Sequence, residues 1–318
     1  MEVLQLTNQE HIEETSSSPK PFILANTLES SLRDIQDNHI IPVFVKDNEP
    51  VISQADFITN ALDVVHSIYT KEAVLSPAVR VSHPIKGRIP DAKDKPANML
   101  TEAEKTIYYE RMAFAIEIPS ITETIDGNIL SLTVGGVKSY HLDNLYNRKG
   151  ADEHFKIYIG FQNKVCTNLC VWSDGFVGDL KVKSTNELVD GIFDLVSNYN
   201  SDKHLSSLSN LGNYEISEQQ FANLIGRCRM YQYLSPQFKS SLTELSFGDN
   251  QLSTVLKDYY NDNSFCRSPN GNINMWRLYN LFTGANKTSY IDTFLDRGVN
   301  AFTFINSIAN NGSSWFLN

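Results

Sequence analysis

Two cysteines four residues apart, Cys166 and Cys170 in the segment VCTNLC, are the first residues whose spacing could do chemistry. On a strand they would share one side but stand roughly 13 Å apart, too far for a disulfide or a shared zinc ion. On a helix they could share a metal, but no C-x-x-C or H-x-x-x-H motif completes a ligand set. We interpret them as small buried thiols and expect VCTNLC to close a hairpin from the preceding strand, with a catalytic thiol as the alternative.

A basic stretch is the second candidate site. Residues 79–89 read VRVSHPIKGRI, an alternation that predicts one strand with a buried face and a charged face. The charged face would span roughly 26 Å from Arg80 to Arg88, and lysines of the next loop continue it, so it could contact several phosphates of a nucleic acid. Cations and a proline, here Pro84, are also what an edge strand uses to avoid pairing with another molecule, and that interpretation stays open.

Aromatic side chains could add base stacking to these cations. Arg227 precedes Tyr231 by about one helical turn, so the two would share a helix face, although such aromatic residues can equally belong to a core. The nucleic-acid site predicted from the sequence consists of Arg80, Lys86, Arg88, Lys93, Lys95, Arg227 and Tyr231.

Other chemistries leave no trace in the sequence. It lacks the dinucleotide, phosphate-loop, zinc-protease and serine-hydrolase motifs. Gly135-Gly136 precedes Val137-Lys138-Ser139 and superficially resembles the end of a phosphate loop, but the first glycine is missing, so we expect a tight turn beside a strand. His141, His154 and His204 each stand alone. We therefore predict no catalytic residue, no metal site and no cofactor, and an enzyme is the less favoured class.

The elements that must position these residues change character along the chain. A helix is expected over residues 53–69 behind Ser53, and a capping box at Thr101 and Glu104 predicts a short helix running into residues 108–109. Strands are expected over residues 111–118 (ended by Pro119), 128–138 (after the turn Asp126-Gly127) and 155–161. Helices dominate the rest: those opened by Ser184-x-x-Glu187 and Ser217-x-x-Gln220, then residues 251–260, 273–282 (ended by Gly284) and 288–310.

Strands first and helices later predict the α+β class, with an antiparallel β-rich part followed by a mainly helical part. We expect a flexible tail over residues 1–21, an α+β sheet domain over 22–180, and a helical region packed on it over 181–318.

Composition restricts the environment and the partners. The chain has 318 residues, 41% of them hydrophobic, which suffices for a sizeable core. Its formal net charge is −10, of which −7 falls in residues 1–60, so a basic patch elsewhere on the surface remains compatible with nucleic acid. The acidic N-terminal residues do not resemble a secretory signal, and no apolar run is long enough for a membrane span, so we expect a cytoplasmic protein without a membrane partner.

Three long stretches carry a resemblance to a known group: RVSHPIKGRIPDAKDKPA, IGFQNKVCTNLCVWSDGF and INMWRLYNLFTGANKTSYIDTFLDRGVNAF. Over about residues 40–310 the chain resembles a family of uncharacterised proteins, a domain of unknown function carried by conjugative transposons, plasmids and other mobile elements of Bacteroidota. An N-x-V-C-x-N element at residues 163–168 and a W-x-x-Y-N element at residues 276–280 are similar to those of a wider set of phage- and plasmid-type proteins. The resemblance implies a role in element maintenance, recombination or countering host defences, and it supplies no catalytic residues.

Two functions follow as hypotheses. The first is binding of nucleic acid, in particular single-stranded DNA, during maintenance or recombination of such an element. The alternative is a protein-binding accessory factor, for instance an anti-defence or regulatory module, whose acidic N-terminal residues meet a host protein. The oligomeric state does not follow from the sequence.

Overall fold

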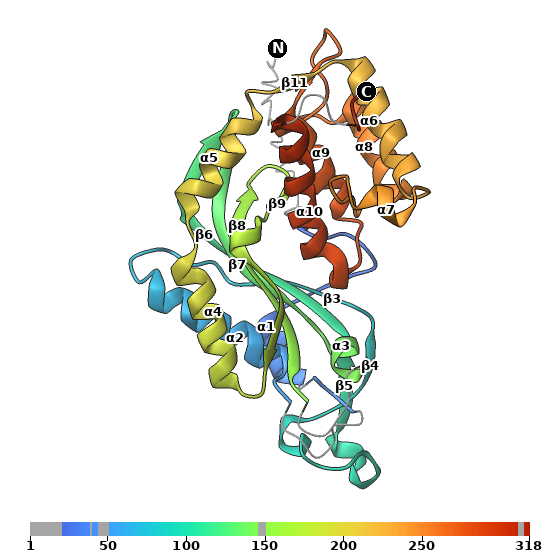
Figure 1. Cartoon of the computed structure of the whole chain (residues 1–318). Helices are drawn as coiled ribbons and strands as arrows, with labels where there is room; N and C mark the ends of the chain where they lie inside the picture. The colour runs from blue at the N-terminus through green and yellow to red at the C-terminus, as the bar shows by residue number, and fades with distance from the viewer. Residues whose placement is uncertain (1–20, 39, 44–50, 146–150, 311–314) are drawn as a thin grey trace, which may run out of the picture.

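A large antiparallel sheet forms the centre of the protein. The computed structural model describes residues 21–38, 40–43, 51–145, 151–310 and 315–318 (Figure 1). In the sheet the strand order is β1, β3, β6, β7, β8, β10, and β9 pairs with β8. The strands are β1 (Leu28–Ser30), β3 (Ala78–Val81), β6 (Arg111–Ile125), β7 (Asn128–Ser139), β8 (Glu153–Asn163), β9 (Leu169–Cys170) and β10 (Phe176–Val182).

Most of the helices follow the large sheet along the chain, and the first three lie between its strands; the predicted α+β class is confirmed. They are α1 (Leu32–Asn38), α2 (Gln54–Ile68), α3 (Tyr140–Leu145), α4 (Thr185–Asn198), α5 (Ser201–Leu211), α6 (Glu218–Tyr231), α7 (Pro236–Lys239), α8 (Asp249–Asn261), α9 (Met275–Asn286) and α10 (Ile291–Asn310). Two short strands, β11 (Glu215–Ile216) and β12 (Ile273–Asn274), pair between them. The predicted division near residue 180 stays a prediction, and residues 1–20 of the predicted tail lie outside the described residues.

Serine caps set the helix starts as predicted. Ser53, Ser184 and Ser217 are the N-caps of α2, α4 and α6, and each accepts a hydrogen bond from a backbone N–H in the first turn. The predicted end of a helix at Gly284 is wrong, because α9 continues to Asn286.

The two longest strands form one hairpin around the predicted turn. Asp126 and Gly127 have φ angles of 47° and 75°, the left-handed conformation that a two-residue hairpin turn requires. The expected end of the first strand at Pro119 is wrong. The β6–β7 register shifts between Ile118 and Thr122, and this irregularity takes up the proline, which has no N–H to donate to a ladder.

The two glycines of the supposed turn instead lie in the middle of β7. A Cβ atom on Gly136 would stand 2.5 Å from the ring of Phe57 and 2.6 Å from the backbone oxygen of Lys156. The predicted tight turn is therefore wrong. Glycine is present because the packed neighbours leave no room for a side chain.

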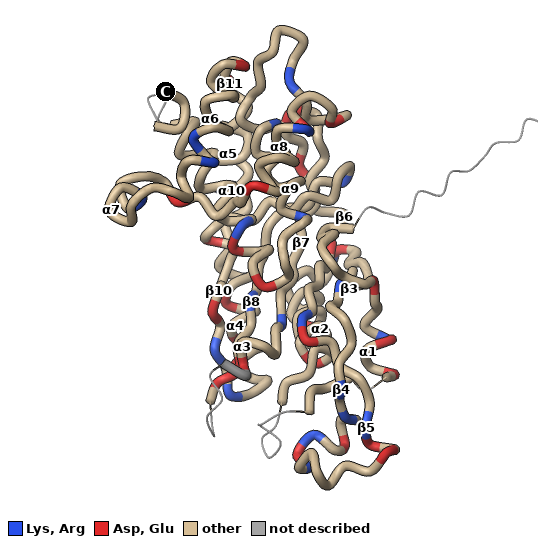
Figure 2. Tube along the Cα trace, turned by 90° about the vertical axis from the view of Figure 1, so that its right-hand side faces the viewer, with Lys and Arg blue, Asp and Glu red and all other residues tan. Residues whose placement is uncertain are grey.

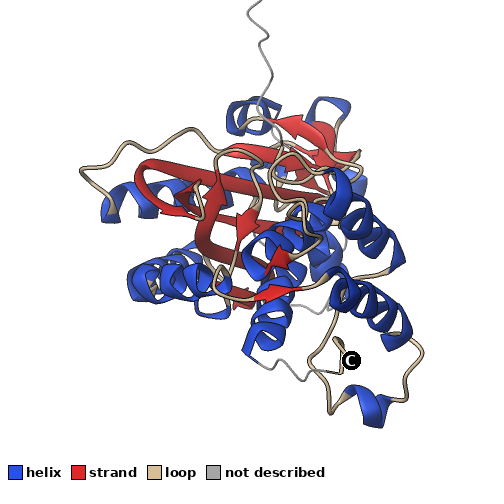
Figure 3. Cartoon of the chain, turned by 90° about the horizontal axis from the view of Figure 1, so that it is seen from above, coloured by secondary structure: helices blue, strands red, loops and turns tan. Residues whose placement is uncertain are grey.

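Helices cover both faces of the sheet (Figure 3). On one face, Phe57 of α2 packs edge-on against Phe114 and Phe155, with ring centroids 5.0 and 4.8 Å away. The opposite face carries small residues such as Ala113 and Ala115, and the first half of α10 packs there through a cluster that includes Phe294. The alternation of side chains along β6 thus separates two cores.

A second, smaller sheet forms an arm, by which we mean residues 84–109. Its strands β4 (Pro84–Arg88) and β5 (Lys105–Tyr109) pair with each other and with β2 (Ile41–Pro42). Three 3₁₀ turns lie between β4 and β5: Pro90–Ala92, Ala97–Met99 and Glu102–Glu104. The arm lies at the end of the molecule remote from α6 and α8 (Figures 1 and 2).

The capping box predicted at Thr101 and Glu104 is present, but the helix predicted after it is wrong. Only one 3₁₀ turn forms, and the next residues, Thr106 to Tyr109, belong to β5. β-Branched and aromatic residues favour the strand conformation, which here outweighs the helix-start signal.

Candidate functional site

The predicted basic strand does not exist as one element. β3 ends at Val81 and belongs to the large sheet, whereas β4 begins at Pro84 and belongs to the arm. The expected single charged face over residues 79–89 is therefore wrong, and Arg80 lies in a different sheet from Lys86 and Arg88.

Arg80 is turned into the protein. Its side chain is 14% exposed. Nε donates to Oγ1 of Thr27 at 3.1 Å and Nη2 to the backbone oxygen of Thr27 at 2.9 Å, while Nη1 stands 4.0 Å from Glu29. These bonds tie the strand to the segment before β1, so Arg80 has a structural role.

Arg88 is also enclosed. It is 1% exposed, and its Nη1 donates to the backbone oxygens of Ala92, Lys93 and Lys95. Five guanidinium N–H groups in a planar fork suit it to gather the carbonyls of a tight turn. The predicted solvent-facing position of Arg88 is wrong, because this side chain forms the interior of the arm.

The lysines of the arm differ in their exposure and in their contacts. Lys95 Nζ lies 2.7 Å from Glu104, and this contact together with hydrogen bonds from Thr101 lowers the pKa of Glu104 to about 2. Lys86 and Lys93 are exposed. Figure 2 shows Lys and Arg interspersed with Asp and Glu along the chain, so the arm presents single cations and no continuous positive row.

Arg227 and Tyr231 lie on α6, four residues apart, beside aromatic residues that the sequence did not single out. The guanidinium carbon of Arg227 stands 4.8 Å from the ring centroid of Trp315, and Nε and Nη2 donate to the backbone oxygen of Asn318. Lys239 Nζ lies 5.4 Å from the ring centroid of Tyr231. Two cation–aromatic pairs therefore form where α6, α7 and the last described residues meet.

Two further aromatic side chains near α7 are exposed to solvent. Tyr233 is 83% exposed and Phe238 is 42% exposed, and Phe238 packs edge-on against Trp315 at 5.9 Å. We define the cation–aromatic surface as Arg227, Tyr231, Tyr233, Phe238, Lys239 and Trp315. Only Arg227 and Tyr231 could be found from helical spacing. Tyr233 lies beyond the end of α6, Phe238 and Lys239 lie on the short helix α7, and Trp315 lies more than 80 positions further along.

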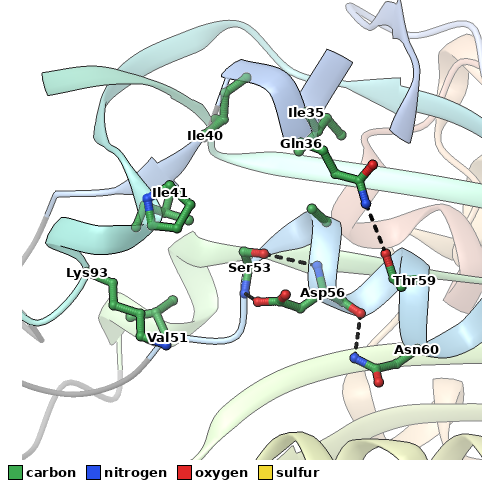
Figure 4. Close-up of a pocket in the computed structure, with 12 residues that line it drawn as sticks. Ile35, Gln36, Ile40, Ile41, Val51, Ser53, Asp56, Thr59, Asn60 and Lys93 are labelled. Carbon is green, nitrogen blue, oxygen red and sulfur yellow. Dashed lines mark hydrogen bonds between the residues drawn. The ribbon is translucent and has the colours of Figure 1, made fainter. Parts of the chain in front are cut away.

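A cavity of about 510 Å³ lies at the other end, between the arm, α1 and the start of α2 (Figure 4). Three isoleucines, Ile35, Ile40 and Ile41, line its inner part and are almost fully buried. Asp56 and Lys93 line it from exposed positions. The cavity thus combines an apolar interior with opposite charges near its mouth.

The cysteines show no reactive geometry. All four are free, and β9 pairs Cys170 with Phe161, which confirms the predicted hairpin. Burial raises the pKa of Cys170 to about 12, so its thiol is not ionised at neutral pH. Cys166 lies in the turn before β9, and burial raises its pKa as well.

The histidines differ in their surroundings. His204 is fully buried among aromatic rings, with Nδ1 2.5 Å from the hydroxyl of Tyr199, and burial lowers its pKa to about 3. His154 Nδ1 lies 2.9 Å from Asp179. Within the described residues, no group of three or more His, Cys, Asp or Glu side chains could hold a metal ion.

The two short sequence elements of the resemblance contact each other in space. Asn168, the last residue of N-x-V-C-x-N, donates from Nδ2 to the backbone oxygen of Asn280, the last residue of W-x-x-Y-N, at 3.0 Å. Thr167 has φ of 57°, and its hydroxyl accepts from Lys287 Nζ at 2.9 Å. These residues join the β8–β9 turn to α9, which gives both elements a structural role.

Comparisons with known proteins identify a family but no activity. Residues 7–317 match DUF3871, described as "Domain of unknown function, B. Theta Gene description", so the chain belongs to this family. No curated protein and no solved structure matches it. Among the described helices, none combines the length and the apolar character that crossing a bilayer requires.

Proposed function

We propose that this DUF3871 protein binds single-stranded nucleic acid through its cation–aromatic surface, and that it serves the maintenance or recombination of a mobile element. The observation that carries the proposal is the pairing of Arg227 with Trp315, whose ring also packs against the exposed ring of Phe238. Unpaired bases stack on aromatic rings and on guanidinium planes, and nearby cations contact the phosphates.

The charge distribution supports this location. A molecule of net charge −10 repels a polyanion at long range, so binding needs a local site where stacking adds to ion contacts. Lys239 and Arg227 supply the cations. Each lies over an aromatic ring, and a nucleic-acid base could stack on the same cation–ring pair. The arm, which carries Lys86 and Lys93, lies at the far end of the molecule, so one short nucleic-acid strand cannot contact both regions (Figure 1).

The test is fluorescence anisotropy with a labelled oligothymidine at several salt concentrations. Two phosphate contacts predict a slope of log K against log salt near −1.4, from about −0.7 each. Lys239→Gln should weaken binding and reduce the slope by about 0.7, whereas Lys257→Gln, an exposed lysine on α8, should change neither.

A stacking variant separates this mode from plain charge attraction. Tyr233→Ala should lose about 1–3 kcal/mol of binding free energy, the usual contribution of one stacked base. Tyr290→Ala removes a ring that is 70% exposed elsewhere and serves as the control. Unchanged affinity in Tyr233→Ala and Lys239→Gln would contradict the proposal. An absence of binding at low salt would leave this surface to a protein partner, the alternative function.

A further inference from the structure

The cavity of about 510 Å³ beside the arm has a wall that is fixed in place before any ligand arrives. Val51 and Ser53 line the cavity, whereas Ile52 between them is turned away from it and buried. This is the alternation of an extended segment, and Ser53 has extended dihedral angles of −69° and 163°.

Buried polar groups hold that segment from behind. The N–H of Ile52 donates to Glu153 Oε1 at 2.9 Å, and Glu153 Oε2 in turn pairs with the fully buried Lys138 at 2.8 Å. The N–H of Gln54 donates to the hydroxyl of Tyr140 at 3.2 Å. A pocket whose wall is anchored in this way loses little ordering entropy on binding.

The lining specifies the chemistry of a ligand. The inner isoleucines accept an aliphatic body, and the volume lies in the ~300–1,000 Å³ range of small-molecule sites. At the mouth, Asp56 offers a carboxylate and Lys93 an ammonium group, and neither forms an ion pair with another described residue. Asp56 Oδ2 accepts the N–H of Ser53 at 3.1 Å, which fixes the carboxylate against the helix start (Figure 4).

We propose that this cavity binds a short aliphatic peptide with both termini free. Its ammonium group pairs with Asp56, its carboxylate pairs with Lys93, and its side chains rest on Ile35, Ile40 and Ile41. A zwitterion fits this mouth better than a fatty acid or an alkylamine, because each of those leaves one of the two protein charges unmatched. The site goes beyond the proposed nucleic-acid function and shares no residue with the cation–aromatic surface.

Isothermal titration calorimetry with the dipeptide Leu-Leu on the full chain tests the site. Leu-Leu should bind saturably, and N-acetyl-Leu-Leu and Leu-Leu-amide, which each lack one terminal charge, should each bind at least 5-fold more weakly. Asp56→Asn should weaken Leu-Leu by a similar factor and make it insensitive to N-acetylation. Lys93→Gln should likewise weaken the binding of Leu-Leu and make it insensitive to amidation of the C-terminus.

Matched variants exclude a general charge effect. Asp63→Asn on the same helix and Lys71→Gln are exposed and lie outside the lining, so both should bind Leu-Leu like the unchanged protein. The proposal is overturned if Leu-Leu shows no saturable binding at millimolar concentration, or if the acetylated and amidated peptides bind equally well. Because Asp56→Asn also removes a capping contact, its melting temperature is measured alongside, and retention of the selectivity for free termini in a folded Asp56→Asn variant likewise overturns it.

Discussion

The side-chain amide of Asn168 donates a hydrogen bond to the backbone carbonyl of Asn280 across 3.0 Å, and this bond links the β8–β9 turn to the middle of a buried helix. Asn168→Asp would place an oxygen against that carbonyl with little change in shape. We expect a loss of about 2–3 kcal/mol in the free energy of unfolding, measured by urea denaturation. Asn250→Asp, in the exposed first turn of α8, should stay within about 0.5 kcal/mol of the unchanged protein.

Two glycine-to-alanine exchanges should have opposite signs. Gly136→Ala forces a methyl group into the ring of Phe57 and a backbone oxygen, and should cost about 2–4 kcal/mol of unfolding free energy. Gly226→Ala lies in α6 with open space around the new Cβ, and should stabilise by about 0.5–1 kcal/mol. The unfolding free energies are measured by thermal and chemical denaturation. If Gly136→Ala were no more destabilising than Gly226→Ala, the packing of β7 against α2 would be looser than the structure implies.

The buried ammonium of Lys138 balances two carboxylates. Nζ lies 2.8 Å from Asp143 and 2.8 Å from Glu153, and the lysine side chain is fully buried. Lys138→Met removes the cation and leaves two buried negative charges, so the unfolding free energy should fall by about 3–5 kcal/mol. Adding Glu153→Gln should recover part of this loss. A double variant no more stable than Lys138→Met alone would contradict the ion-pair explanation.

His204 should make the protein sensitive to mild acid. Its pKa is about 3 in the folded state, against about 6.5 for an unperturbed histidine, so below pH 6.5 the unfolded chain takes up a proton that the folded chain refuses. Stability is therefore present at neutral pH and falls as the pH drops, by about 2 kcal/mol between pH 7 and pH 5.

The check is urea denaturation at both pH values. His204→Leu, although less stable overall, should lose most of the dependence in this window, where carboxylates scarcely titrate. His83→Asn, at an exposed position, should keep it. If the pH dependence of the unfolding free energy persisted in His204→Leu, a group other than His204 would cause it.

Lys95→Gln should raise the pKa of the Glu104 carboxyl group, because it removes the lysine that contacts it. Its pKa of about 2 rests first on the hydrogen bond from Lys95 and then on those from Thr101. Loss of the lysine charge should raise the pKa part of the way towards the usual value near 4.3, which NMR titration of the Glu104 side chain would detect. Lys105→Gln, whose partner is Glu102, should leave the pKa of Glu104 nearly unchanged.

Local signals in the sequence predicted the elements that depend on neighbouring residues alone. The serine caps of α2, α4 and α6 and the turn at Asp126-Gly127 satisfy backbone groups within a few residues, so their residue types suffice to find them. The β-rich first part and the helical second part followed from the same patterns.

Features that depend on distant partners could not be predicted in the same way. Whether residues 79–89 form one strand or two depends on which sheet each half joins, and alternation is the same in both cases. Gly136 in β7 is restricted by Phe57, almost 80 residues earlier in the chain. For the candidate surface, spacing gave Arg227 and Tyr231, but Trp315 and Lys239 reach them only through tertiary packing.

The contact between the first described residues and the last helices has a consequence for biosynthesis. The N–H groups of Leu24 and Ala25 donate to the backbone oxygen of Lys287, and the ring of Phe22 packs on Phe294 at 6.2 Å. A chain emerging from the ribosome therefore holds one side of its sheet uncovered until α9 and α10 have been translated. Chaperone association during synthesis should persist until that point, and ribosome-bound fragments that stop before residue 287 should be the most prone to aggregate.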